Sequence, residues 1–223
     1  MLTRELLSTG AYLDAFQDLP GPPCWTRQRI EDSLRETLAQ RPEGTPVWLF
    51  AYGSLIWNPL LKYVERQSAV LQGWHRSFCI RLLAGRGTYE KPGRMLALHT
   101  GGHSTGVAFR LDEPTLWEEL GLVWVREMVH GLYRPIWGTI RLAGGKIVPS
   151  LAFVANTGHA QYESDATIAT AAPLIARASG HIGSNRDYLL QLDTTLREHG
   201  IADDYIQQLA NAVREYPGDG NTP

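Results

Sequence analysis

Helical patterns of apolar and polar residues occupy both ends of the chain. A short helix is predicted within residues 1–23, before the Pro/Gly-rich break DLPGPP. A second helix is predicted from Arg27 to Gln40, because apolar residues recur there every three to four positions and Thr26 can cap its start. Further helices are predicted near the C-terminus, followed by a frayed tail, over residues 168–179, 184–200 and 202–215.

Between these helices the pattern changes to that of short β-strands. Strands are predicted over 47–53, 69–83, 94–100 and 104–112, the last two as a hairpin across Gly101-Gly102, and two more are predicted within 133–155. A helix from Pro114 to Glu127 interrupts them. This order predicts an α+β fold with a mixed or antiparallel sheet of about five to seven strands, which can close into a small barrel with flanking helices.

The expected organisation is an N-terminal helical extension over residues 1–45, one domain over 46–216 and a flexible tail over 217–223. Hydrophobic residues make up 43% of the 223 positions and charged residues 20%, which is typical of a globular protein. A net charge of −2 gives no electrostatic footprint for nucleic acid or for an anionic membrane. We therefore expect neither as a partner.

No window approaches the ~20 uninterrupted apolar residues of a transmembrane helix, and the first residues lack a signal-peptide core. Cys24 and Cys79 are far apart and form no CxxC motif, which fits a reducing cytoplasm with both thiols packed and inert. His99 and His103 flank two glycines at a predicted hairpin tip, so their spacing is not that of a metal site. A cytoplasmic protein without a metal is expected.

The stretch FAYGSL raises the question of whether Ser54 is a nucleophile. A nucleophile elbow needs the pattern G-x-S-x-G, which the flanks Tyr52-Gly53 and Leu55-Ile56 do not supply. Alternatively, a glycine after a strand lets successive backbone N–H groups point one way, so that the amides of Gly53, Ser54 and Leu55 can grip a carboxylate. A β-bulge at a barrel rim is a third interpretation, and it is compatible with the second.

Glu127 lies in the otherwise apolar run LGLVWVREMVHGLYRP. A carboxylate in such a run either projects into water, which is the commoner case, or occupies a cleft in which burial raises its pKa. In the second case it can act as a general base near neutral pH. Elsewhere in the chain, the loop GRGTYEKPGR, residues 85–94, is either a mobile surface loop or a lid or specificity loop over a cleft.

Six motifs in order resemble the ChaC family of γ-glutamylcyclotransferases: FAYGSLIWNP, GWHRSF, KPGRMLAL, GVAFRL, VREMVHGLY and GSNRDYL. The resemblance runs from about Val47 to Glu215. It implies a γ-glutamylcyclotransferase-like barrel and the conversion of glutathione to 5-oxoproline and cysteinylglycine without a cofactor. In that reaction the α-amine of the substrate attacks its own γ-carbonyl, so no serine or cysteine nucleophile is needed.

The resemblance also implies site residues. Glu127 matches the family's catalytic glutamate, and Tyr52, Gly53, Ser54 and Leu55 match its glutamyl-binding loop. Tyr188 matches a tyrosine of the pocket, and Arg76 and Arg94 match recurring positions that we expect to bind substrate. The stretch REMVHGLY is two residues longer than the REKGGY of eukaryotic members, which affects loop geometry.

Two alternatives remain open at this level. The same fold can act on other γ-glutamyl amines or dipeptides, or it can serve as a non-catalytic regulatory or binding protein. The sequence does not indicate an oligomeric state, a preference between reduced and oxidised glutathione, the groups of the oxyanion site, or the role of the N-terminal extension.

Overall fold

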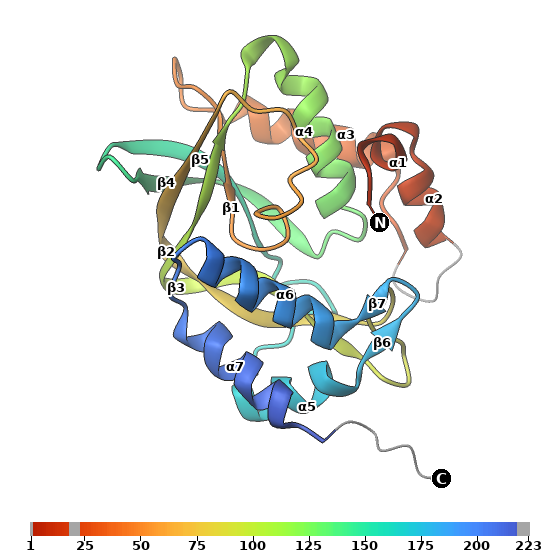
Figure 1. Cartoon of the computed structure of the whole chain (residues 1–223). Helices are drawn as coiled ribbons and strands as arrows, with labels where there is room; N and C mark the ends of the chain where they lie inside the picture. Colours follow the sequence, from red (N-terminus) through yellow and green to blue (C-terminus); the bar gives the residue numbers. More distant parts are fainter. Residues whose placement is uncertain (1, 18–22, 218–223) are drawn as a thin grey trace.

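A closed five-stranded β-barrel forms the centre of the computed structural model, which describes residues 2–17 and 23–217 (Figure 1). Most of the predicted Pro/Gly break and of the predicted tail lie outside these residues. The barrel order is β1-β3-β2-β4-β5, with β1 spanning Trp48–Ala51, β2 Glu65–Leu82, β3 Gly93–Arg110, β4 Tyr133–Leu142 and β5 Ile147–Ala155. The predicted α+β fold with a small mixed barrel is confirmed.

All four residues of strand β1 are buried. It pairs antiparallel with β3, and its parallel pairing with β5, where Leu49 lies opposite Leu151, closes the barrel. A strand that is buried on both faces requires a continuous apolar run, which is what VWLF supplies. The chain leaves β1 directly into Tyr52–Leu55, so this turn begins at the end of the most buried strand.

The predicted hairpin across Gly101-Gly102 is wrong. Strand β3 continues through both glycines and stays paired with β2, with Gln72 opposite His103 and Trp74 opposite Thr100. Gly101 and Gly102 have φ angles of 106° and 63°, and Gly73 on the partner strand has a φ of 80°. Glycines with positive φ in facing strands produce an irregularity that bends the ladder, and such bends allow a small sheet to close.

Helices cover the barrel in two groups (Figure 1). Helix α3 (Arg27–Ala39) begins at Thr26, whose side chain accepts a hydrogen bond from the Arg29 amide, as predicted. It packs beside α4 (Leu116–Glu127), which follows a short 3₁₀ helix at Glu113–Thr115. The other group contains α5, α6 and α7, which span Ile168–Arg177, Asn185–Glu198 and Asp204–Glu215; the two-residue strands β6 (Ser179–Gly180) and β7 (Gly183–Ser184) join α5 to α6.

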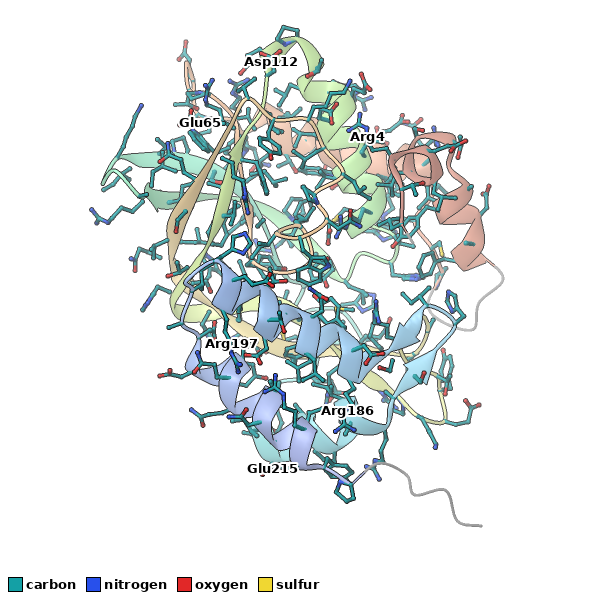
Figure 2. The ribbon with its side chains drawn as sticks, viewed as in Figure 1. Arg4, Glu65, Asp112, Arg186, Arg197 and Glu215 are labelled. Atoms are coloured by element: carbon teal, nitrogen blue, oxygen red, sulfur yellow. The ribbon has the colours of Figure 1, made fainter. Side chains whose placement is uncertain are left out.

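The N-terminal extension contains two short helices where one was predicted. Helix α1 (Arg4–Thr9) ends at Gly10, whose φ of 88° is left-handed, and α2 (Ala11–Gln17) follows at once. Leu7 and Leu13 belong to the same hydrophobic core as the barrel. Figure 2 labels Arg4 where α1 meets α4. Within the described residues, no helix is long and apolar enough to cross a membrane.

Candidate active site

The turn after β1 presents backbone amides that no described residue accepts. The Ile56 amide donates to the Gly53 carbonyl at 2.9 Å, and the Asn58 amide donates to the Ser54 carbonyl at 3.0 Å. Among the hydrogen bonds of the described residues, none has the amide of Gly53, Ser54 or Leu55 as its donor. The turn therefore resembles the first turn of a helix, whose leading N–H groups are free to bind an anion.

Gly53 is required for close packing rather than for its dihedral angles. Its φ does not lie in the left-handed region. A Cβ atom at this position would lie 3.2 Å from Cδ2 of Leu96 and 3.3 Å from the hydroxyl oxygen of Tyr188. The absence of a side chain therefore lets the Tyr188 hydroxyl, carried by α6, approach the backbone of the turn.

Glu127 is the last residue of α4, and its side chain is 16% exposed because it faces a cavity. Burial raises the pKa of its carboxyl group, and the neighbouring Arg126 opposes this shift. Nε of Arg126 lies 3.1 Å from Oε1 of Glu127, and Nη2 of Arg126 donates to the Ser54 hydroxyl at 2.7 Å. One guanidinium group therefore connects the carboxylate to the turn.

Tyrosines surround this carboxylate. Burial and the charge of Glu127 raise the pKa of Tyr188 to about 12, and burial also raises the pKa of Tyr52 and Tyr133 well above the usual range. All three are therefore neutral near pH 7 and able to donate a hydrogen bond. Tyr133 already donates to the Leu96 carbonyl at 3.0 Å. Tyr188 packs against Trp57, with ring centroids 5.8 Å apart.

A cavity of about 910 Å³ unites these groups. Its lining includes Tyr52, Gly53, Ser54, Leu55, Glu127 and Tyr188, six of the eight residues that the sequence suggested. The volume lies in the range of sites for small organic ligands, and the wall combines apolar side chains with a few polar groups. Elements distant in sequence, β1, α4 and α6, therefore bring the predicted residues together.

Arg76 and Arg94 are not among the described residues that line the cavity. Arg76 is 2% exposed, and its Nε donates to the Tyr52 carbonyl at 2.8 Å. Its remaining nitrogens donate to the Thr105 carbonyl and, at 3.0 Å, to the Asp203 carboxylate. Arg76 thus binds the backbone of the turn without lining the cavity.

Arg94 is 4% exposed, and its main-chain amide and carbonyl are both bound by the Asn185 side chain, at 2.7 and 2.8 Å. Its guanidinium lies 3.6 Å from the Glu163 carboxylate. Asn185 is the first residue of α6, so this contact ties β3 to the helix that carries Tyr188.

Sequence reasoning missed several residues of the cavity wall. Tyr12 and Phe16 come from α2, and Arg86 and His130 come from loops. The only signal for the first pair is their i, i+4 spacing, which places two aromatic rings on one helix face. Within the described residues, no group of three or more His, Cys, Asp or Glu side chains is arranged to hold a metal ion.

The closed mixed barrel with its two groups of flanking helices is a γ-glutamylcyclotransferase fold. A crystal structure of a γ-glutamyl cyclotransferase specific to glutathione from yeast superposes with a TM-score of 0.72 at 20% identity, covering 80% of this chain and all of that one. Residues 47–216 match the family of ChaC-like proteins. The chain belongs to the ChaC family.

Curated relatives extend the comparison. The glutathione-specific gamma-glutamylcyclotransferase of Escherichia coli (strain K12) is 46% identical over 215 residues, which cover 96% of this chain and 93% of that protein. The glutathione-specific gamma-glutamylcyclotransferase 1 of Danio rerio is 32% identical over 155 residues, covering 68% of this chain and 79% of that protein. The bacterial relative therefore also aligns with most of the N-terminal extension.

Proposed function

We propose that this protein is a γ-glutamylcyclotransferase that converts glutathione to 5-oxoproline and cysteinylglycine. The observation that carries the proposal is that one largely buried carboxylate, Glu127, lines the same cavity as the free amides of Gly53, Ser54 and Leu55. The relatives at 46% and 32% identity, whose names specify glutathione, support this choice of substrate.

The turn after β1 positions the γ-glutamyl group. Its α-carboxylate binds to the amides of Gly53, Ser54 and Leu55, and this holds the adjacent α-amine on the side of Glu127. Arg126 contacts both Ser54 and Glu127, so the carboxylate site and the proton carrier keep a fixed separation. Because amine and γ-carbonyl belong to one molecule, folding the chain back makes the attack intramolecular, and such positioning can lower the barrier by several kcal/mol.

Glu127 carries protons during the reaction. It takes a proton from the α-ammonium group, whose nitrogen then attacks the γ-carbonyl carbon. As the bond from that carbon to the cysteinyl nitrogen breaks, the protonated carboxyl returns a proton to the departing amine. Glu127 makes this transfer twice, so the ring nitrogen loses two protons in all, the leaving nitrogen gains two, and no water or outside acid is consumed. The raised pKa of Glu127 suits both roles near neutral pH.

Tyr188 is the proposed donor to the oxyanion that forms at the γ-carbonyl oxygen. Its hydroxyl lies beside Gly53, and its pKa of about 12 keeps the proton in place near pH 7. A neutral donor fixed in a buried site stabilises developing negative charge without reorganising. Arg76 and Arg94 act behind the cavity wall, as residues that position the turn and α6.

Ser54 is not needed as a nucleophile in this scheme. Its hydroxyl accepts a hydrogen bond from Arg126, a permanently protonated group that cannot serve as the base that a serine nucleophile requires. Cys79 is buried with a raised pKa, and neither it nor Cys24 is among the described residues that line the cavity. The substrate's own amine therefore supplies the attacking atom.

A substrate panel tests the proposal. The purified protein is incubated with glutathione, oxidised glutathione and several γ-glutamyl dipeptides, and 5-oxoproline is measured over time. Release of equal amounts of 5-oxoproline and cysteinylglycine from glutathione, faster than from the dipeptides, is the expected result. Faster turnover of the dipeptides would reassign the substrate. Saturable binding without release of 5-oxoproline from any compound would overturn the enzymatic role.

A further inference from the structure

The N-terminal extension lines the candidate active site although it lies outside residues 47–216, which match the family. Leu2, Leu6, Ala11, Tyr12, Ala15 and Phe16 all belong to the cavity wall. These residues come from the start of the chain and from helices α1 and α2. The cavity that holds Glu127 is therefore completed by a segment outside the region that defines the family.

An ion pair anchors this segment firmly. Both terminal nitrogens of Arg4 bind the carboxylate of Glu119, at 2.6 and 2.9 Å, and the Lys62 amide donates to the same carboxylate at 2.7 Å. Glu119 is fully buried and lies on α4, the helix that ends at Glu127. Two-point pairing of this kind fixes orientation as well as distance. Helices α1 and α2 are thus held in place relative to the catalytic helix.

A second contact joins the extension to the loop after Glu127. The Trp25 amide donates to the Val129 carbonyl at 2.7 Å. Gly131 has a φ of +67°, and a Cβ atom there would lie within 2.6 to 2.7 Å of three atoms of the Trp25 indole. This glycine belongs to the stretch MVHGLY, part of the REMVHGLY segment that is two residues longer than the REKGGY of eukaryotic members. The longer loop and the extension therefore pack against each other.

Two aromatic side chains of α2 extend this contact into the cavity. The rings of Tyr12 and Phe16 meet edge to face, with centroids 5.1 Å apart. The Phe16 ring also contacts His130, at 5.6 Å, and His181, at 6.3 Å. His130 follows α4, whereas His181 lies between β6 and β7 and is exposed. The Phe16 ring therefore contacts two different segments of the cavity wall, and one of these contacts, with His181, lies at the solvent-exposed edge of the wall.

The reaction geometry indicates which part of the substrate meets these rings. The γ-glutamyl half is held by the turn after β1 and by Glu127, and the leaving half departs from the same carbonyl carbon. It must then occupy the part of the cavity that these groups leave open. Burial and, after it, the charge of Glu127 raise the pKa of Tyr12 to about 12, so Tyr12 lies within electrostatic range of Glu127 in the same cavity.

We propose that helices α1 and α2 form the subsite for the leaving dipeptide, with Tyr12 and Phe16 as the residues that contact it. This rests on the cyclotransferase function proposed above. An aromatic face packs well against a short extended peptide, and the neutral Tyr12 hydroxyl can donate to one of its carbonyls. The extension thereby determines which amines this enzyme accepts as leaving groups.

Steady-state kinetics on matched variants of α2 test the proposal. Phe16→Ala removes the aromatic contact, and Tyr12→Phe removes only the hydroxyl. Leu13→Ala is the control, because Leu13 lies on the same helix and is buried in the core but does not line the cavity. Each variant is assayed with glutathione and with γ-glutamylcysteine, which has a shorter leaving group, and Tm is recorded for each.

Phe16→Ala should raise the KM for glutathione about tenfold with kcat within twofold, and Tyr12→Phe should raise it about threefold. Leu13→Ala should lower Tm and leave this KM unchanged. If the wild-type protein turns over γ-glutamylcysteine, Phe16→Ala should change the KM for γ-glutamylcysteine less than it changes the KM for glutathione. Phe16→Leu, which keeps apolar volume, should shift KM in the same direction if Phe16→Ala does not purify as a folded protein.

An unchanged KM in both Phe16 variants would overturn the subsite, and so would an equal rise in Leu13→Ala. Failure of the underlying function looks different, because the wild-type protein would then release no 5-oxoproline from any γ-glutamyl compound. The two failures are therefore separated by the wild-type assay alone.

Discussion

Replacing Glu127 by glutamine keeps the shape of the side chain and removes its ability to accept a proton. Among the described residues that line the cavity, Glu127 is the only carboxylate, so no neighbouring acid can substitute for it. Loss of a general acid–base group lowers turnover by about 10² to 10⁴-fold. The buried position favours the middle of that range or above, and a loss of about 10³-fold corresponds to about 4 kcal/mol of barrier.

The assay follows 5-oxoproline release from glutathione by purified wild-type protein and Glu127→Gln. Glu118→Gln is the matched control, because Glu118 lies on the same helix with a side chain that is 66% exposed, away from the cavity. The control should retain the wild-type kcat. Turnover of Glu127→Gln within tenfold of the wild type would refute the assignment of Glu127 as the proton carrier.

The pH dependence of the wild-type enzyme gives a second measurement. Because burial raises the pKa of Glu127, the decrease of kcat/KM on the acidic side should have its midpoint at a higher pH than the pKa of an ordinary glutamate.

The raised pKa of Glu127 also affects the stability of the folded protein. A carboxyl group whose pKa is higher in the folded state disfavours folding once the pH rises above its ordinary pKa, and has no such effect below it. The Tm of Glu127→Gln should therefore exceed that of wild type at pH 7, and the gap should close near about pH 4.

Three further substitutions test the turn after β1 and its support. Ser54→Ala should keep at least about a tenth of kcat, because the hydroxyl is not the attacking atom; a loss beyond about 10³-fold would instead mark a nucleophile. Gly53→Ala adds a Cβ atom 3.2 Å from Leu96 and 3.3 Å from the Tyr188 hydroxyl, so KM for glutathione should rise about tenfold, and an unchanged KM would show that the close approach has no role. Arg76→Met removes a buried cation that binds the Tyr52 carbonyl and the Asp203 carboxylate, so urea unfolding should show a loss of about 3 kcal/mol, whereas wild-type stability would contradict the supporting role.

The fold could be predicted from the sequence where the local pattern and the tertiary environment agree. The four buried residues of β1 form a continuous apolar run, and the Thr26 cap marks the start of α3. The Gly101-Gly102 pair was misinterpreted because two consecutive glycines occur both in hairpin turns and at bends within a strand. Only the partner strand decides between them, and here β2 continues past both glycines with its own positive-φ glycine at position 73.

The residues of the candidate site could be recognised in the sequence where a single residue departs from the local pattern. Glu127 stands out as a charge within an apolar run, and the Tyr52–Leu55 turn follows a buried strand. The position of Arg76 behind the turn could not be read from the sequence, since it depends on a contact with a residue 127 positions away, Asp203. The contribution of Phe16 was hidden for the same reason, because it requires α2 to pack beside the loop after α4 and the β6–β7 connection.

Arg126 explains why the turn and the carboxylate can act together. Its guanidinium contacts Glu127 at 3.1 Å and the Ser54 hydroxyl at 2.7 Å, and it also donates to the Asn58 carbonyl at 2.5 Å. The Asn58 amide in turn donates to the Ser54 carbonyl, so Ser54 is bound to α4 both directly and through Asn58. A substrate whose carboxylate rests on the turn amides is therefore placed at a distance from Glu127 that the protein sets before binding. Such preorganisation is what an intramolecular attack requires, because the substrate supplies the nucleophile and the protein has only to hold it in place.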